Sequence, residues 1–124
     1  MSEVEKILKN DTDGLASYEY LVNHSEDEIA ALTPVIDKII AVDTTGQFVS
    51  SAARYLSATE PERYADVIDR LINAAIEKDK ERSYLPALLS SIWGEDYMER
   101  AEQLRETDDN FRRIYKRVHN VGAF

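Results

Sequence analysis

The sequence predicts an all-α protein, and three observations lead to that prediction. Apolar residues recur throughout the 124-residue chain at the i, i+3, i+4, i+7 spacing that places them on one side of a helix. No sustained apolar–polar alternation occurs, and no tight turn joins two β-branched runs. Four glycines and three prolines leave little chain for long linkers. We therefore expect one compact domain over residues 1–124, with more than about 65% helix and no strand.

The N-terminal part of the chain carries one or two short helices, over the apolar residues of 4–8 and of 15–22. Ser25 and Glu28 then match a capping box, with Ser at N-cap and Glu at N3, which predicts that the next helix begins at Ser25. Pro34 lies inside this helix, and its ring clashes with the carbonyl four residues earlier. We therefore expect either a kink between residues 30 and 33 or a later start near Thr33.

The middle of the chain predicts two more helices. Asp43-Thr44-Thr45-Gly46 ends the preceding helix, and a new apolar face follows over residues 48–56. The most regular amphipathic stripe comes next, over residues 64–76. Thr59 at N-cap, followed by Glu60-Pro61-Glu62 in the first turn, predicts that this helix begins at Thr59. Ile68 and Leu71 lie at the middle of the stripe, so we expect them at the centre of the core.

Three helices complete the prediction. Lys80-Glu81-Arg82 precedes an apolar set over residues 85–93 with Pro86 in its first turn, and Gly94 ends that helix. A short helix follows over residues 97–104. Thr107-Asp108-Asp109 then caps a last helix whose apolar side comprises Phe111, Ile114, Tyr115 and Val118. The total is seven or eight short helices, which we expect to pack in antiparallel pairs.

Two pairs of segments resemble each other at spacings that match the length of a helix pair. Residues 36–40 resemble residues 68–72 at a spacing of 32, and the apolar set of 49–56 resembles that of 85–92 at a spacing of 36. Such periods are typical of short HEAT/TPR-like stacks, although no TPR signature residues align. The other architecture open to these helices is an irregular orthogonal bundle.

The charge distribution indicates which partners the protein attracts. The net charge is −9, and seven acids against two arginines give residues 95–110 a charge of −5, whereas residues 111–124 carry +4. An acidic body repels nucleic acid and attracts basic proteins.

The N-terminus is acidic and no long apolar run occurs, so we expect a cytoplasmic protein with no membrane span. The absence of cysteine suits a reducing compartment.

The sequence offers no convincing catalytic or metal-binding pattern. Asp11-Thr12-Asp13-Gly14 resembles part of a calcium loop, but in that register a ligand position falls on Lys9 and the bidentate glutamate position on Tyr20. We interpret it as an Asp-rich turn in which Gly14 closes the first helix. Neither His24 nor His119 has an acid or another histidine three or four residues before it, and there is no Gly-x-Ser-x-Gly elbow and no phosphate-binding glycine loop. We expect no enzyme, no cofactor, no metal site, and no catalytic residues.

The last helix carries the clearest local charge pattern, with four basic residues on one side: Arg112, Arg113, Lys116 and Arg117. This helix either binds nucleic acid, docks a partner, or packs on the domain with its basic side facing the acidic segment 95–110. We favour the third interpretation, because few phosphate contacts are available against an opposing field. Pairs with Glu99, Glu102 or Glu106 would then hold the basic side, and replacing the four cations with Gln would leave stability nearly unchanged.

Taken together, these patterns predict a non-enzymatic protein–protein interaction module whose acidic surface engages a basic protein or peptide. Two alternatives stay open. One is an immunity or inhibitor protein that blocks a basic toxin or nucleic-acid enzyme. The other is a nucleic-acid-binding regulator that uses the C-terminal basic helix. A homo-oligomer is compatible with the sequence, and the residues that bind the partner are unknown from the sequence alone.

Overall fold

The computed structural model describes residues 2–119, and within that range the chain is 75% helical with no strand. The expectation of an all-α fold with more than about 65% helix is therefore confirmed. Eight α-helices and one 3-10 helix follow in order: α1 Glu3–Asn10, α2 Leu15–Asn23, α3 Ile29–Val42, α4 Gln47–Thr59, α5 Ala65–Lys78, α6 Leu85–Trp93, η1 Tyr97–Arg100, α7 Ala101–Thr107 and α8 Asp109–His119. Residues 120–124, the last five of the basic segment 111–124, lie outside the residues that the structure describes.

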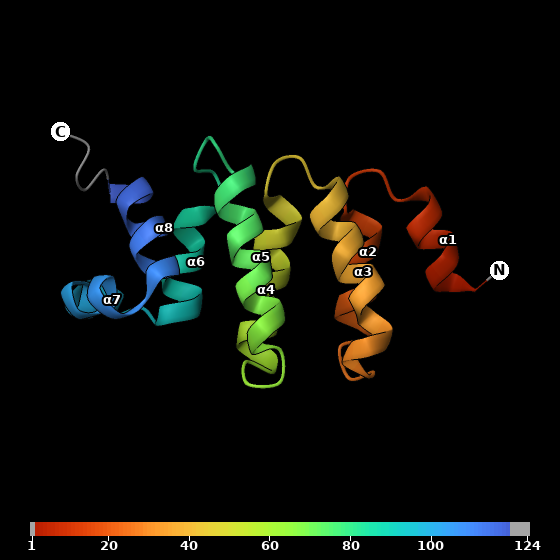
Figure 1. The fold of residues 1–124 in the computed structure, drawn as a ribbon, viewed down its shortest axis with the longest axis horizontal. Helices are drawn as coiled ribbons and strands as arrows, with labels where there is room; N and C mark the ends of the chain where they lie inside the picture. The colour runs from red at the N-terminus through yellow and green to blue at the C-terminus, as the bar shows by residue number, and fades with distance from the viewer. Residues whose placement is uncertain (1, 120–124) are drawn as a thin grey trace.

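The helices stand side by side in two rows (Figure 1). α2, α4 and α6 form one row, in which α4 contacts both neighbours. α1, α3, α5 and α8 form the other, and α4 packs most closely against α5 across the two rows. The turns before α2, α4 and α6 lie along one edge of the molecule, and the turns that join α2 to α3 and α4 to α5 lie along the opposite edge.

Each of the three turns along the first edge is built on one buried aspartate. Asp11, Asp43 and Asp79 follow the ends of α1, α3 and α5, and each accepts hydrogen bonds from backbone N–H groups at the start of the next helix. In every case one of those donors lies six residues ahead, at 2.8 to 3.0 Å: Ser17, Val49 and Leu85. The carboxylate satisfies donors that a helix N-terminus leaves free.

Consecutive turns pack against each other through their glycines. Gly14 and Gly46 adopt left-handed φ angles of 101° and 91°, which favour glycine. A Cβ on Gly46 would lie 2.9 Å from Cβ of Asp79, and one on Gly14 would lie 3.6 Å from Cβ of Asp43. The third turn has Arg82, with φ 58°, in the corresponding position. Gly14 thus precedes α2, whereas the sequence interpretation had it closing the first helix.

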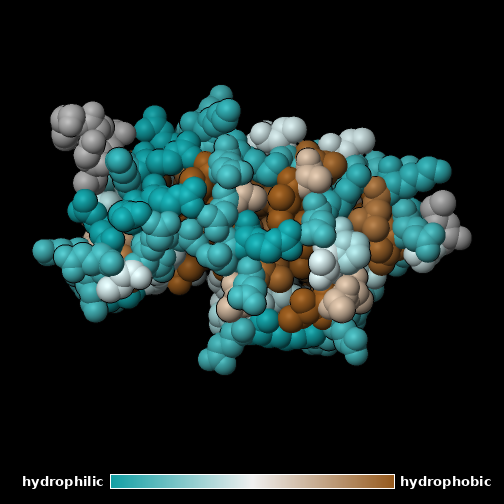
Figure 2. Space-filling view, in the orientation of Figure 1, coloured by the Kyte–Doolittle hydropathy of each residue, from teal (hydrophilic) through white to brown (hydrophobic). Residues whose placement is uncertain are grey.

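The core fills the space between the two rows and contains the residues that the sequence places there. Leu71 is fully buried, so its prediction is confirmed, whereas Ile68, at 8% exposure, belongs to the core but lies at its edge. Phe111 and Ile114 of α8 are also buried, with Tyr115 and Val118 packed against the core, so the last helix is docked. Figure 2 shows hydrophilic side chains over most of the α3–α5–α8 face, with hydrophobic ones gathered between α3 and α5.

Two predicted helix starts are wrong. α3 begins at Ile29, because the carbonyl of Ser25 accepts hydrogen bonds from Tyr64 Oη at 2.6 Å and from Arg63 at 3.0 Å, which hold residue 25 in the turn before the helix. Because α3 begins at Ile29 and contains Pro34, the alternative start near Thr33 is also wrong.

The predicted start at Thr59 is wrong for a different reason. Thr59 is the last residue of α4, where its hydroxyl donates to the carbonyl of Tyr55 at 2.9 Å. α5 begins only at Ala65, after the fully buried Tyr64. The predicted ends at Asp43-Thr44-Thr45-Gly46 and at Gly94 are confirmed, and within Thr107-Asp108-Asp109 the capping residue is Asp108, whose Oδ1 accepts from the N–H of Phe111 at 3.1 Å.

Candidate functional site

An apolar groove with an acidic rim opens where α5, the end of α6 and the start of α8 meet. Its volume is about 300 Å³. Ile68, Ile72, Ile92 and Trp93 supply the apolar lining, and Asp69, Asp108 and Asn110 supply the polar lining. Pro61 of the α4–α5 turn and Ala65 at the start of α5 also line it, so the groove reaches that turn.

Hydrogen bonds fix the polar rim of this groove. Trp93 Nε1 donates to Asp108 Oδ2 at 2.8 Å, while the other oxygen of Asp108 caps α8. Asn110 Nδ2 donates to Asp69 Oδ1 at 2.5 Å, which ties α8 to α5. The ring of Trp93 meets Phe111 edge-on with centroids 5.3 Å apart. The two carboxylates and the indole are therefore held before any partner arrives.

The residues that line this groove include no lysine or arginine. The nearby cations are engaged elsewhere: Arg70 pairs with Asp37 of α3 at 2.6 Å, and Arg113 donates to Asn73 at 2.6 Å. An apolar floor beside two carboxylates fits a lysine or arginine side chain, whose aliphatic stem packs on hydrocarbon while its head meets an acid.

Further acids extend along the edge opposite the aspartate turns. Glu26, Asp27 and Glu28 lie between α2 and α3, Glu60 and Glu62 lie between α4 and α5, and Glu95 and Asp96 follow α6. Most of these side chains are exposed. The two arginines of these turns, Arg63 and Arg100, contact Glu60 and Asp96. The edge is therefore a source of negative potential beside the groove.

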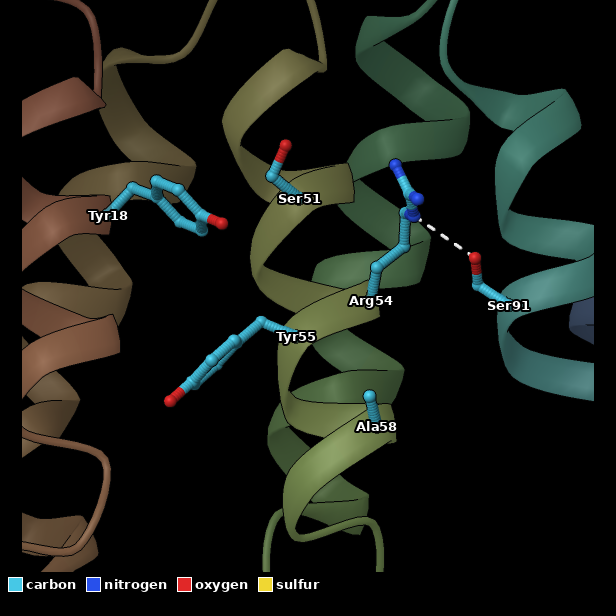
Figure 3. Close-up of a pocket in the computed structure, with 6 residues that line it drawn as sticks. All are labelled: Tyr18, Ser51, Arg54, Tyr55, Ala58 and Ser91. Atoms are coloured by element: carbon cyan, nitrogen blue, oxygen red, sulfur yellow. Dashed lines mark hydrogen bonds between the residues drawn. The ribbon is translucent and has the colours of Figure 1, made fainter.

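A second groove, of about 420 Å³, runs along α4 on the other row of helices (Figure 3). Tyr18 of α2, four residues of α4 and Ser91 of α6 line it. Arg54 Nε donates to Ser91 Oγ at 3.0 Å, and Tyr55 Oη donates to the carbonyl of Val22 at 3.2 Å. Across α2, α4 and α6, which have 9, 13 and 9 residues, only Glu19 and Arg54 carry charge.

The residues singled out in the sequence do not meet at one site. His24 pairs with Asp27 at 3.2 Å and stacks on Tyr20, whereas His119 lies in the last turn of α8 beside Tyr115. Among residues 2–119, no group of three or more His, Asp or Glu side chains is arranged to hold a metal ion. Asp11 and Gly14 serve the first turn described above.

The basic side of α8 differs in part from the prediction. Arg112 pairs with Asp109 and lines a small groove with Glu102 and Glu106, so one cation does face the acidic segment. Arg113 and Arg117 turn instead toward α5. Arg117 donates to the carbonyls of Ile76 and, at 3.0 Å, of Asp79, at the C-terminal end of α5. These contacts arise because α8 packs against α5, which the sequence did not predict.

Among the residues that the structure describes, three groups have shifted pKa values, and all three shifts lead away from neutrality. Burial alone would raise the pKa of Asp11, but the Ser17 hydroxyl and backbone N–H groups of the turn outweigh burial and lower it below 3.8. Burial raises the pKa of Tyr64 and of Tyr20 above the ordinary value of 10.0.

Neither groove was predicted from the sequence. The three aspartate turns were not predicted either, although the sequence contains a signal for them. Asp11, Asp43 and Asp79 are separated by 32 and 36 residues, the same spacings at which the apolar segments echo each other. That coincidence could have identified the three equivalent turns.

No helix within the described residues is both long and apolar enough to cross a membrane. No family model, curated protein or solved structure matches the chain.

Proposed function

We propose that this chain is a non-enzymatic protein-interaction module whose acidic surface engages a basic protein or peptide. The observation that carries the proposal is the groove between α5, α6 and α8, in which an apolar floor lies beside Asp69 and Asp108. A lysine or arginine of the partner would pack its stem on Ile68, Ile72 and Trp93 and place its charge against the carboxylates. The absence of cysteine supports a cytoplasmic setting for this interaction.

We further propose that the fold is a short stack of helix pairs, the HEAT/TPR-like alternative. The support comes from the three aspartate turns along one edge, and from the glycines of the first two, which lie against the next turn along the chain. Sequential helix pairs in such a stack contact mainly their neighbours and leave long faces for partners. The orthogonal bundle would not require equivalent turns at this regular spacing.

The inhibitor alternative draws support from the acidic turns beside the groove. Glu26, Asp27, Glu28, Glu62 and Asp96 would cover a phosphate-binding surface of a basic toxin or nucleic-acid enzyme. A nucleic-acid regulator has weaker support, because Arg113 and Arg117 are engaged with α5, which leaves Arg112 and Lys116 as the exposed cations of α8.

The test uses isosteric removal of the two rim charges. After capture of the partner by the full-length protein from its native source, its affinity is measured by calorimetry for the wild type and for Asp69→Asn with Asp108→Asn. Asn keeps one acceptor oxygen at each position, so Asp108→Asn loses either the Trp93 or the Phe111 hydrogen bond, and the circular dichroism spectrum and thermal unfolding of the double variant are measured first to establish that it is folded. We expect the affinity to fall by about threefold or more per charge, with a steep salt dependence in the wild type.

The matched control is Asp13→Asn with Glu19→Gln, which removes the same two charges elsewhere on the molecule. It should change affinity by less than about twofold. Equal losses in both double variants would show that only the net charge matters, and no loss in either would remove the groove from the binding surface. A captured nucleic-acid enzyme inhibited by the wild type would select the inhibitor alternative.

A further inference from the structure

The row formed by α2, α4 and α6 differs in composition from the rest of the protein. Charged residues make up 31% of the chain, but these three helices carry only Glu19 and Arg54. The surface of this row is supplied instead by tyrosine, serine, alanine and similar uncharged side chains. Depletion of charge together with exposed tyrosine is typical of the centre of a protein interface.

Arg54 lies in the groove of this row without an acidic partner. Among the described arginines, Arg63, Arg70, Arg100 and Arg112 each pair with a carboxylate, whereas the hydrogen bond of Arg54 is to Ser91. That bond uses Nε at 3.0 Å, so the two terminal nitrogens stay free to bind a ligand (Figure 3). Two terminal N–H donors of one guanidinium match the two oxygens of a carboxylate.

The other lining residues favour an uncharged, extended segment around that carboxylate. Tyr18 and Tyr55 are half-buried and place rings in the groove, and the hydroxyl of Tyr55 is held by the carbonyl of Val22. Ser51, Arg54 and Ala58 follow one side of α4, so the groove extends for about 10 Å along the helix, the length of about three extended residues. A second charge on the segment would find no counter-charge in this lining.

We propose that the groove along α4 is a second docking site, which takes an extended, otherwise uncharged segment of a partner protein and holds one Asp or Glu side chain of it at Arg54. Arg54 supplies one positive charge to the lining, and the net charge of −9 opposes segments with several acids or a phosphate more strongly than a segment with one carboxylate. This site is on the row of helices opposite α5 and α8, and it is independent of the acid-rimmed groove.

The test is selection of random peptides displayed on phage against the immobilised full-length protein, followed by affinity measurements with synthetic peptides. Alongside basic peptides selected by the acid-rimmed groove, we expect a second enriched class whose members share one Asp or Glu flanked by uncharged residues. Arg54→Gln should weaken their binding by at least about tenfold. Arg70→Gln, which removes an arginine from the other row, should leave it unchanged. Arg54→Glu should recover binding to peptides in which Lys replaces the shared acid.

Several results would overturn the proposal: no enriched peptide that contains a single acid, tighter binding by multiply acidic or phosphorylated peptides, or equal binding to Arg54→Gln. Because Arg54 is exposed, its replacement should leave the circular dichroism spectrum intact, and that measurement separates lost binding from lost folding. Binding of the selected peptides to Asp69→Asn with Asp108→Asn should match the wild type. Failure of the acid-rimmed groove is thereby distinguished from failure of this site.

Discussion

The carboxylate of Asp11 shows how much of a turn one side chain organises. Its Oδ1 accepts from the N–H groups of Asp13 and Gly14, and its Oδ2 accepts from that of Ser17 at 2.9 Å. These donors, which favour the ionised form, lower its pKa although burial opposes them. A depressed pKa in the folded state means that the ionised carboxylate stabilises the fold.

We therefore predict a pH-dependent effect of Asp11→Asn. At neutral pH the variant should be about 1–2 kcal/mol less stable, because an amide offers only one acceptor oxygen where the carboxylate uses two. The advantage of the wild type is complete above the unfolded-state pKa of about 3.9 and disappears as pH falls through the lower pKa of the folded state. Urea unfolding of both proteins across this pH range measures the difference.

The control for this prediction is Asp13→Asn, because exposed Asp13 uses one oxygen to accept from the N–H of Leu15 and an amide can replace it there. Its stability should stay within about 0.5 kcal/mol of the wild type at neutral pH. A gap between wild type and Asp11→Asn that stays constant down to strongly acid pH would contradict the ionic role of Asp11.

At the scale of elements, α8 depends on its contacts with the end of α5. Arg117 donates there to the carbonyls of Ile76, which lies in the last turn of α5, and of Asp79, which also accepts from the N–H of Arg82. We expect Arg117→Gln to lower the free energy of unfolding by about 1–2 kcal/mol, whereas Arg112→Gln, which removes an exposed pair with Asp109, should change it by less than about 0.5 kcal/mol. Thermal unfolding of the two variants gives the comparison, and equal values would contradict the capping role.

The helices themselves were largely predictable, but two of their starts were not. Ser25 and Thr59 both carry the local signature of an N-cap, yet the first is held by Tyr64 and the second donates back into α4. A signature of four residues contains no information about a partner 39 positions away. The same limit applies to the grooves: Arg54 and Ser91 meet only because α4 packs beside α6, and no spacing in the sequence reveals that contact.

At the scale of the whole molecule, both rows rely on α5, whose apolar residues face the shared core. Leu71 is fully buried at its middle. We predict that Leu71→Ala lowers the free energy of unfolding by about 2–5 kcal/mol, because a truncated side chain leaves a cavity that packing only partly fills. Chemical denaturation with fluorescence of Trp93 measures this loss. An unchanged midpoint would mean that α5 is not central to folding.

The order of the helices along the chain also affects the folding rate. α2 packs against α3, α4 against α5, and α7 against α8, so many contacts join elements that are adjacent in sequence. Closing such short loops costs little chain entropy, and proteins rich in local contacts fold in microseconds to milliseconds, as an order of magnitude. A chain that refolds on that timescale after transient opening spends little time with its apolar stripes exposed to aggregation.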